Sequence, residues 1–256
     1  MKKLYKFLLN TLPRPLLIRM SYVFRKVAPA FYKGNNVECP VCERSFRKFL
    51  SYGSNVAHRE NVLCPYDLTL ERHRLMWLYL KHESNFFTAP QLNVLHIAPE
   101  QCFHSTFKAQ KNLNYLTGDL VSPIADIHFD LHEIPLEDER FDVIFCNHVL
   151  EHVDDAKKCM SELYRVMKTG GWGIIQVPID VNRDTTYEDW SITSPKDREI
   201  HFWQKDHVRL FGNDYPQWLE SVGFKVTEAF QDFKISPEMV ERFRLNPVEK
   251  LYIVYK

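Results

Sequence analysis

The sequence contains no apolar run near the roughly 20 residues that a membrane-spanning helix requires, so we expect no such helix. It also lacks a surplus of charge, because 33 basic residues balance 33 acidic ones, which argues against a surface that grips nucleic acid. Six cysteines, two of them in one CPVC pair, suit a reducing cytoplasm better than a disulfide scaffold. The opening MKKLYKFLLN resembles a signal peptide, but Asn10 and Pro13 interrupt it and no small-residue cleavage site follows. We therefore expect a cytoplasmic protein that binds no nucleic acid.

The balanced total hides an uneven distribution, because every charged residue before Glu38 is basic. Residues 1–36 predict two helices, the second running from Pro15 to Ala28. Two interpretations stay open. The helices either pack on the main body or lie on an anionic lipid surface, so that residues 1–33 contact a membrane peripherally. The apolar face of the first helix would consist of Leu4, Phe7 and Leu8.

Residues 37–84 contain a CPVC and a CPYD motif, which together resemble the paired knuckles of a zinc ribbon. A residue other than the usual glycine follows each motif, namely Glu43 and Leu68. Two alternatives stay open: a weakened zinc site, or a relic ribbon held by packing alone. The candidate ligands are Cys39, Cys42, Cys64 and Asp67, with His58 as a spare.

The run LTLERHRLMWLYLKHE, which follows these motifs, predicts a helix. We expect His73 and His82 on its surface. Its predicted buried residues are Leu70, Leu75, Leu78 and Tyr79.

Residues 85–256 alternate strand and helix, which is typical of a doubly wound α/β fold. Strands are predicted in NVLHIA, LNYLTGD, ADIHFD, FDVIFCN, WGIIQVPI, FKVTEAF and KLYIVYK. Helices are predicted at 101–111, from a cap at Asp154 to a close at Gly170 and Gly171, and at 215–222. The polar and aromatic segment 180–212 lies where a substrate lid would sit.

In an open parallel sheet, ligands bind beyond the carboxyl ends of the strands, so the residues that follow each strand are the ones to inspect. Asp119 follows the second strand, and a carboxylate there can accept two hydrogen bonds from a ribose diol. Asp130 with Leu131 suits an adenine, which needs an acceptor for its amine and an apolar wall. Asn147 and His148 follow the fourth strand and would face the reactive end of the ligand.

The run VLHIAPE…YLTGDLVSP…IPLEDERFDVIFCNHVLEHVDD…GGWGIIQVP resembles a class I S-adenosylmethionine-dependent methyltransferase of the ubiquinone/menaquinone-biosynthesis type, methyltransferase type 11. The resemblance implies a Rossmann-like, mostly parallel seven-stranded sheet whose last strand is antiparallel. It also implies that Asp119, with Leu120 beside it, holds the cofactor ribose and that Asp130 and Leu131 hold the adenine. Asn147 and His148 would lie near the methyl group. The CPVC and LERHRLMWLYL motifs resemble the zinc-ribbon-like annex of some members.

The departure from this family is the stretch LNVLHIAPEQCF, where the family pattern is close to VLDIGCGTG. His96 replaces the acid, and Ala98, Glu100 and Cys102 replace three glycines, which normally let the backbone approach the cofactor. We expect a rebuilt loop in which His96, Ala98 and Glu100 contact S-adenosylmethionine and Glu100 pairs with its α-ammonium. The alternative is that Glu100 only starts the following helix, where its charge suits the helix dipole.

Methyl transfer from a sulfonium is an in-line displacement, so the enzyme mainly aligns the acceptor and, for a hydroxyl or protonated amine, supplies a base. His207 is the first candidate for this base and His148 the second. The alternatives are that His207 is a solvent-exposed lid residue and that His148 only supports its neighbours. Two interpretations stay open for Arg183, Arg198 and Arg209, which either bind an anionic substrate or form a solvated lid surface. Glu151 or His152 either faces the methyl site or is buried structure.

The sequence thus predicts methyl transfer to a small molecule, such as a lipid or saccharide precursor. A nicotinamide oxidoreductase would also use Asp119, but the chain lacks the GxGxxG pattern that binds a pyrophosphate. A non-catalytic scaffold that uses the ribbon for protein contacts stays open as the alternative.

Overall fold

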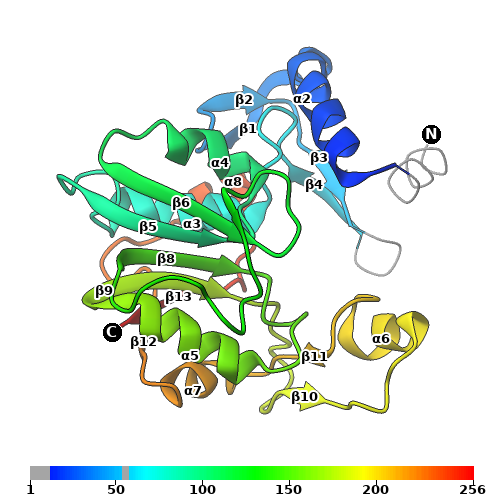
Figure 1. Cartoon of the computed structure of the whole chain (residues 1–256). Coiled ribbons are helices and arrows are strands. Elements are labelled where there is room, and N and C mark those ends of the chain that lie inside the picture. Colours follow the sequence, from blue (N-terminus) through cyan, green and yellow to red (C-terminus); the bar gives the residue numbers. More distant parts are fainter. Residues whose placement is uncertain (1–11, 54–57) are drawn as a thin grey trace. The chain divides into compact units, whose positions relative to one another are not determined.

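The computed structural model describes residues 12–53 and 58–256, so the first predicted helix, with Leu4, Phe7 and Leu8, lies outside the described residues. Two compact units make up the chain (Figure 1). Unit 1 comprises Met1–Leu78 and Ile235–Val248, and unit 2 comprises Tyr79–Lys234 and Glu249–Lys256. None of the helices in the described part of the chain is long and apolar enough to cross a membrane.

Unit 1 consists of a long helix, two short antiparallel strand pairs and a short helix near its end. Helix α2 continues through Pro29, so the predicted end at Ala28 is wrong. Pro29 lies in the last turn of α2, where its missing N–H costs only one backbone hydrogen bond. The elements are α2 (Arg14–Phe31), β1 (Lys33–Cys39), β2 (Arg44–Phe46), β3 (Leu50–Tyr52), β4 (Arg59–Leu63) and α8 (Pro237–Phe243).

Helix α3 (Glu71–His82) begins in unit 1, and the boundary between the units falls within it. Its predicted buried residues are confirmed as buried. His73 is buried too, which corrects the surface position expected for it, because its Nδ1 accepts the backbone N–H of Leu70 at 3.0 Å. Arg74 is fully buried and occupied by backbone carbonyls of unit 1, those of Val62, Thr69, Phe243 and Arg244.

Unit 2 is built on the predicted seven-stranded sheet, whose strand order is β12-β13-β9-β8-β5-β6-β7. The last strand in sequence, β13, is antiparallel to both of its neighbours, and the other pairs are parallel, which confirms the fold class. Figure 1 shows β6, β5, β8 and β9 side by side. The strands are β5 (Leu92–Ile97), β6 (Leu113–Asp119), β7 (Ile127–His128), β8 (Phe141–Asn147), β9 (Met167–Gln176), β12 (Lys225–Glu228) and β13 (Tyr252–Tyr255).

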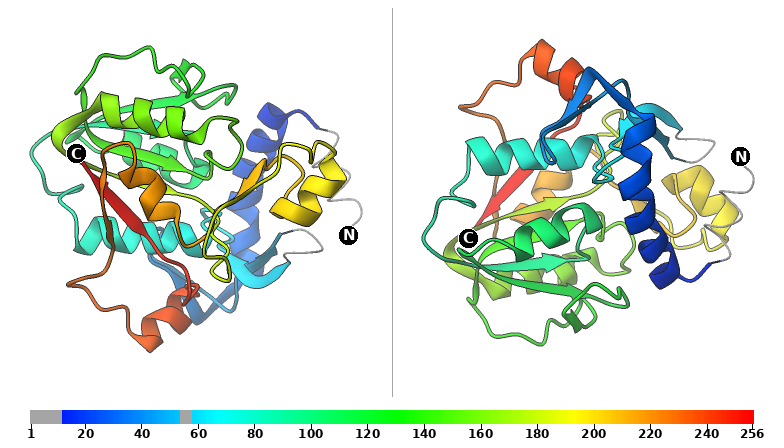
Figure 2. Two further views of the ribbon diagram at one scale, coloured as in Figure 1. Left: turned by 90° about the horizontal axis from the view of Figure 1, so that it is seen from below. Right: turned by 90° about the horizontal axis from the view of Figure 1, so that it is seen from above.

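Helices α5 (Ala156–Val166) and α7 (Tyr215–Glu220) cover one face of this sheet, and α4 (Gln101–Lys108) lies on the other, as the two views of Figure 2 show. The predicted apolar stripe of α5 is confirmed, since Ala156, Met160 and Leu163 are buried in the core of the sheet. The α4 face is aromatic: Phe107 stacks on Phe103 with ring centroids 5.0 Å apart. Cores on both faces of the sheet explain why most of the buried residues in its central strands are apolar.

Several predicted helix boundaries differ from those observed. Helix α4 ends at Lys108 rather than at Lys111, and α7 ends at Glu220 rather than at Val222. Asp155, not Asp154, caps α5, by accepting the N–H of Lys158 at 2.9 Å. Gly170, with φ of 80°, and Gly171 lie within β9 instead of closing the helix. Pairing with the sheet overrides the local stop signal, because α5 passes directly into β9.

The predicted lid segment contains a two-stranded sheet and one helix, and projects beyond the carboxyl ends of β8 and β9 (Figures 1 and 2). Asp180 begins it, and its backbone N–H donates to the carbonyl of Phe211 at 2.9 Å. The elements are β10 (Tyr187–Glu188), α6 (Pro195–Phe202) and β11 (Arg209–Leu210).

Candidate functional site

The register of the sheet brings the predicted cofactor residues to one edge. In the parallel ladders, Ile97 at the end of β5 is opposite Gly118 of β6 and Cys146 of β8. Asp119 and Asn147, the last residues of β6 and β8, therefore lie on either side of the loop that follows β5. This is the position at which open α/β sheets bind ligands.

The loop after β5 is organised by a buried histidine and a carboxylate. His96 Nε2 lies 2.5 Å from Glu100 Oε2, and His96 Nδ1 lies 2.8 Å from the Tyr115 hydroxyl. Asn147 Nδ2 donates to Glu100 Oε1 at 3.0 Å. Glu100 occupies the N-cap position of α4, but its side chain makes no capping hydrogen bond there. The Glu100 carboxylate is therefore held at the ends of β5 and β8 and does not cap the helix.

Ala98 takes the backbone conformation that a glycine would supply. Its φ is 49°, in the left-handed region that costs a residue with a side chain of order 1–3 kcal/mol. Its N–H donates to the Gly118 carbonyl at 2.8 Å, which ties the turn to β6. The loop thus keeps a turn of the glycine type although its glycine has been replaced.

Asp119 lies at the end of β6 with one carboxylate oxygen engaged. Its Oδ1 accepts the backbone N–H groups of Val121 at 2.8 Å and Ser122 at 2.6 Å. Oδ2 makes no hydrogen bond within the described residues and stays available to a ligand. The neighbouring Leu120 and Val121 are exposed, so apolar surface adjoins this carboxylate.

The predicted adenine residues differ in exposure. Asp130 is exposed, and its Oδ1 accepts the N–H of His132 at 2.9 Å and lies 2.6 Å from His132 Nδ1. The hydrogen bond from this backbone N–H lowers the pKa of Asp130, which keeps it ionised. Leu131 is buried in the core of the sheet.

The turn after β8 pairs a histidine with a buried acid. His148 has φ of 56°, and its Nδ1 lies 3.2 Å from Glu151 Oε1. Glu151 is only 1% exposed. Burial alone would raise its carboxyl pKa, but the hydrogen bond with His148, together with the charges of His148 and His152, outweighs burial, and the pKa lies below its ordinary value. Glu151 therefore holds the His148 imidazole in one orientation.

His207 is 1% exposed, so the alternative that it is a solvent-exposed lid residue is wrong. Its Nδ1 donates to the Phe202 carbonyl at 2.9 Å, and burial lowers the pKa of the imidazole. The ring meets that of His152 edge to face with centroids 4.7 Å apart. One ligand atom from each of Glu151, His152 and His207 lies within 4.8 Å of the others.

The arginines that were expected to bind an anionic substrate behave differently. Arg209 is buried, pairs with Glu188 at 2.6 Å and donates to backbone carbonyls of the turn after β8, so it is structural rather than substrate-binding. Arg183 lies over the Tyr187 ring and near Asp180. Arg198 donates to the Ile192 carbonyl at 3.3 Å. No local sequence signal indicates Tyr115 as the partner of His96, since only the pairing of β5 with β6 brings them together.

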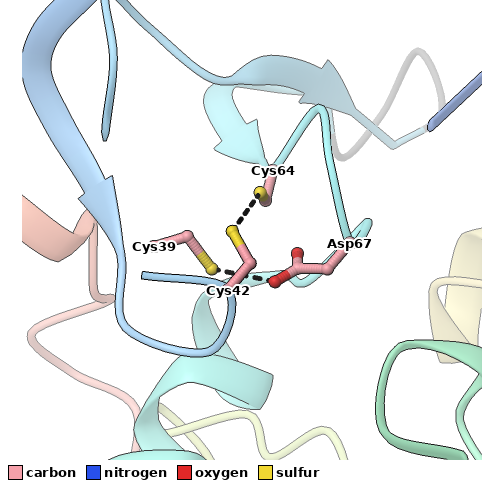
Figure 3. Close-up of side chains that lie close together, drawn as sticks. All are labelled: Cys39, Cys42, Cys64 and Asp67. Atoms are coloured by element: carbon pink, nitrogen blue, oxygen red, sulfur yellow. Dashed lines mark hydrogen bonds between the residues drawn. The ribbon is translucent and has the colours of Figure 1, made fainter. Parts of the chain in front are cut away.

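Unit 1 gathers the four predicted metal ligands into one buried group, whose ligand atoms all lie within 4.8 Å of one another (Figure 3). Cys39 Sγ lies 3.1 Å from Asp67 Oδ2, and Cys42 Sγ lies 3.9 Å from Cys64 Sγ. Burial, reinforced by the charge of Cys39, raises the pKa of Asp67 to about 6. Within the described part of the chain, His58 does not join this group.

Both knuckles adopt the turn that glycine usually allows. Glu43 has φ of 55° and Leu68 has φ of 64°, both in the left-handed region. Their N–H groups donate to the carbonyls of Cys39 at 2.8 Å and Cys64 at 3.0 Å. The missing glycines therefore do not abolish the knuckle geometry.

Comparison with known proteins agrees with this architecture. Residues 90–175 match the family described as "Methyltransferase domain". A probable S-adenosylmethionine-dependent methyltransferase of Mycolicibacterium smegmatis is 31% identical over 113 residues, covering 43% of this chain and 39% of that protein. A ubiquinone/menaquinone biosynthesis C-methyltransferase of Brucella canis is 25% identical over 122 residues, 41% of this chain and 44% of that protein. An uncharacterized protein of Methanocaldococcus jannaschii is 33% identical over 103 residues, which cover 39% of this chain and 45% of that protein.

The match spans less than half the length of these curated relatives. A crystal structure of a SAM dependent methyltransferase from Archaeoglobus fulgidus is 17% identical, with a TM-score of 0.46, and covers 71% of this chain and 93% of that chain. The fold and the family match confirm the resemblance to class I S-adenosylmethionine-dependent methyltransferases. Within that class, the sequence similarity extends to the ubiquinone/menaquinone-biosynthesis type.

Proposed function

We propose that the chain binds S-adenosylmethionine at the carboxyl edge of β5, β6 and β8 and transfers its methyl group to a small-molecule acceptor. The convergence of Glu100, Asp119 and Asn147 at this edge, within the region that matches the methyltransferase family, is the observation that carries the proposal. The donor set fits the cofactor. Asp119 Oδ2 accepts from the ribose diol, the exposed Asp130 carboxylate from the adenine amine, and Glu100 neutralises the α-ammonium.

When bound, S-adenosylmethionine supplies an electrophilic methyl group on a sulfonium. The chain aligns the acceptor with that methyl group and removes a proton from the acceptor. We assign proton acceptance to His148 rather than His207, because a base must reach the acceptor and His148 is 24% exposed. Its Nδ1 is held by Glu151, so we assign proton acceptance to Nε2, an atom that is itself buried and has no partner among the described residues.

The test is a calorimetric titration of the purified chain with S-adenosylmethionine and with S-adenosylhomocysteine. Micromolar binding, about −8 kcal/mol, supports the proposal. If a folded sample binds neither compound, the proposal fails and the non-catalytic scaffold becomes the better account. A thermal unfolding curve of the same sample shows that the protein was folded.

For unit 1, we propose one structural zinc ion held by Cys39, Cys42, Cys64 and Asp67. Two observations support it: the ligand atoms are gathered in a buried group, and both knuckles keep the left-handed turn. Asp67 Oδ1 accepts from the backbone and hydroxyl of Thr69 at 2.9 and 2.7 Å, which leaves Oδ2 for the metal. With four protein ligands the coordination sphere is closed, which fits a structural rather than a catalytic ion.

For α2, we propose contact with an anionic lipid surface. An apolar face with the spacing of a helix stays exposed on it, and the charged residues that surround this face are all basic. A peripheral position would bring the chain to acceptors carried in a membrane, which favours a lipid or lipid-linked saccharide as acceptor. The exposed apolar residues are Leu16, Met20, Val23, Phe24, Val27 and Phe31.

A further inference from the structure

Glu151, His152 and His207 form a cluster beside the proposed methyl site. Two buried polar atoms of this cluster have no hydrogen-bond partner among the described residues, Glu151 Oε2 and His207 Nε2. Both residues are 1% exposed. A buried polar atom that stays unpaired costs about 1–3 kcal/mol, more when it is charged, so such atoms usually have a ligand. Two of them within one cluster of residues point to a bound water or ion that would pair with them.

The other polar side-chain atom of each residue already has a partner in the protein. Glu151 Oε1 pairs with His148, and His207 Nδ1 donates to the Phe202 carbonyl. His152 Nδ1 lies 3.2 Å from the Asp206 carbonyl. This is the arrangement found around bound metals, in which each ligating imidazole donates its other N–H to a carbonyl or carboxylate that orients the ring.

Two distant segments are joined to form the cluster. Glu151 and His152 belong to the turn after β8, whereas His207 comes from the end of the lid segment, and the N–H of Val208 donates to the Glu151 carbonyl at 2.9 Å. Arg209 holds the same turn through the carbonyls of Leu150, Val153 and Asp154. The three ligand atoms, within 4.8 Å of one another, are therefore positioned before any ion binds.

We propose that Glu151, His152 and His207 bind a divalent transition-metal cation. Two imidazoles and one carboxylate favour Mn²⁺, Fe²⁺, Co²⁺ or Zn²⁺ over Ca²⁺, and three ligands leave coordination positions open. Such a cation would hold a hydroxyl-bearing acceptor and make its oxygen more acidic, while His148 takes the proton. The role in catalysis rests on the proposed methyl transfer, but the binding of the ion does not.

The experiment uses Mn²⁺ as the probe, because thiolate ligands prefer softer ions and the unit 1 cluster should not compete for it. The full-length chain is titrated with Mn²⁺ in metal-free buffer. The affinity is obtained from the electron paramagnetic resonance signal of the Mn²⁺ that stays free. We expect His152→Ala and Glu151→Gln to weaken Mn²⁺ binding by roughly 10-fold or more. His152 is exposed, so its replacement should leave the fold intact even if Glu151→Gln does not fold.

His201→Ala, which alters an exposed histidine of the same lid segment, is the matched control and should bind Mn²⁺ like the unaltered chain. No Mn²⁺ binding by the folded chain, or binding that His152→Ala leaves unchanged, would overturn the site. Titration with S-adenosylhomocysteine runs in parallel. Mn²⁺ binding without cofactor binding means that the proposed function fails while the metal site stands. Cofactor binding without Mn²⁺ binding means that the metal site fails while the proposed function stands.

Discussion

His96 and Glu100 form a hydrogen-bonded pair across one turn of chain, with His96 Nε2 2.5 Å from Glu100 Oε2. The pair reverses the usual order of this loop, because a histidine occupies the end of β5 and the acid comes one turn later. Asn147 binds the other carboxylate oxygen, so the acid is anchored from β5 and β8 together. The Glu100 carboxyl group thus lies at the place where we propose that the cofactor's amino-acid part binds.

If Glu100 neutralises the α-ammonium, Glu100→Gln should weaken binding of S-adenosylhomocysteine by about 10- to 100-fold, the worth of a charge-assisted hydrogen bond. Binding of 5′-methylthioadenosine, which has no α-ammonium, should hardly change. Calorimetric titration of both compounds measures the difference. An equal loss for the two would show that Glu100 only supports the loop.

Asp119→Asn should weaken binding of S-adenosylmethionine by roughly 1–3 kcal/mol, because the ribose loses a charged acceptor while the amide oxygen still closes the turn. Asp126→Asn is the control. Asp126 hydrogen-bonds Thr117 and Lys108 on the neighbouring strand and helix, so its loss should affect stability but not affinity. Unchanged affinity in Asp119→Asn would contradict the ribose assignment.

Asp67→Cys should hold zinc more tightly than the unaltered chain, because it completes a set of four thiolates. Asp67→Ala should lose the ion more readily to a chelator and unfold at a lower temperature. Metal analysis after dialysis against graded chelator concentrations ranks the zinc affinities of the unaltered chain and the two variants. If zinc is absent from the unaltered chain and from both variants, unit 1 is held by packing alone.

Glu162→Gln should lower the free energy of unfolding by about 1 kcal/mol at pH 7, because Glu162 Oε2 pairs with Arg165 at 2.7 Å. The hydrogen bond from Arg165 lowers the pKa of Glu162 below 4.5 in the folded chain. Its contribution is therefore complete above pH 4.5 and is lost as the pH falls through the folded pKa. Urea unfolding at several pH values should show the difference between variant and unaltered chain shrinking in acid.

The control for this pair is Glu137→Gln, an exposed acid of the same surface without an ion pair among the described residues. It should change the free energy of unfolding little at any pH. A difference between Glu162→Gln and the unaltered chain that stays constant down to pH 3 would contradict the assigned ion pair.

Val23→Asp should reduce binding to vesicles that contain an anionic phospholipid, because it puts a charge in the middle of the exposed apolar face of α2. Vesicles of a zwitterionic lipid should bind weakly in every case. Flotation with the full-length chain measures both. Equal binding to the two vesicle types, or binding that Val23→Asp does not change, would remove lipid as the partner of α2.

Local patterns predicted most of the sheet. The sequence predicted β5, β6 and β8 within one or two residues, and β8 stands out because it is apolar nearly throughout, as a strand covered on both faces should be. Helix ends were predicted less well. Asp154 and Asp155 are both competent caps, but only Asp155 caps α5, while Asp154 Oδ1 lies 3.1 Å from His132 Nε2.

The exposure of single polar side chains could not be predicted from the sequence. His207 lies in a polar segment and reads locally as a surface residue, yet pairing with the turn after β8 buries it. Arg209 was a candidate for binding a substrate, but its guanidinium donates instead to the Glu188 carboxylate and to the backbone carbonyls of the turn after β8. These carbonyl partners depend on contacts between segments more than fifty residues apart.

The sequence alone therefore determined the sheet, the acids that follow its strands and the spacing of the cysteine motifs, because these follow from local periodicity and short-range geometry. The tertiary structure decided which side chains meet. Strand register placed Glu100 between His96 and Asn147, and the return of the lid segment brought His207 to Glu151. Both outcomes depend on long-range backbone hydrogen bonding, which no local pattern encodes.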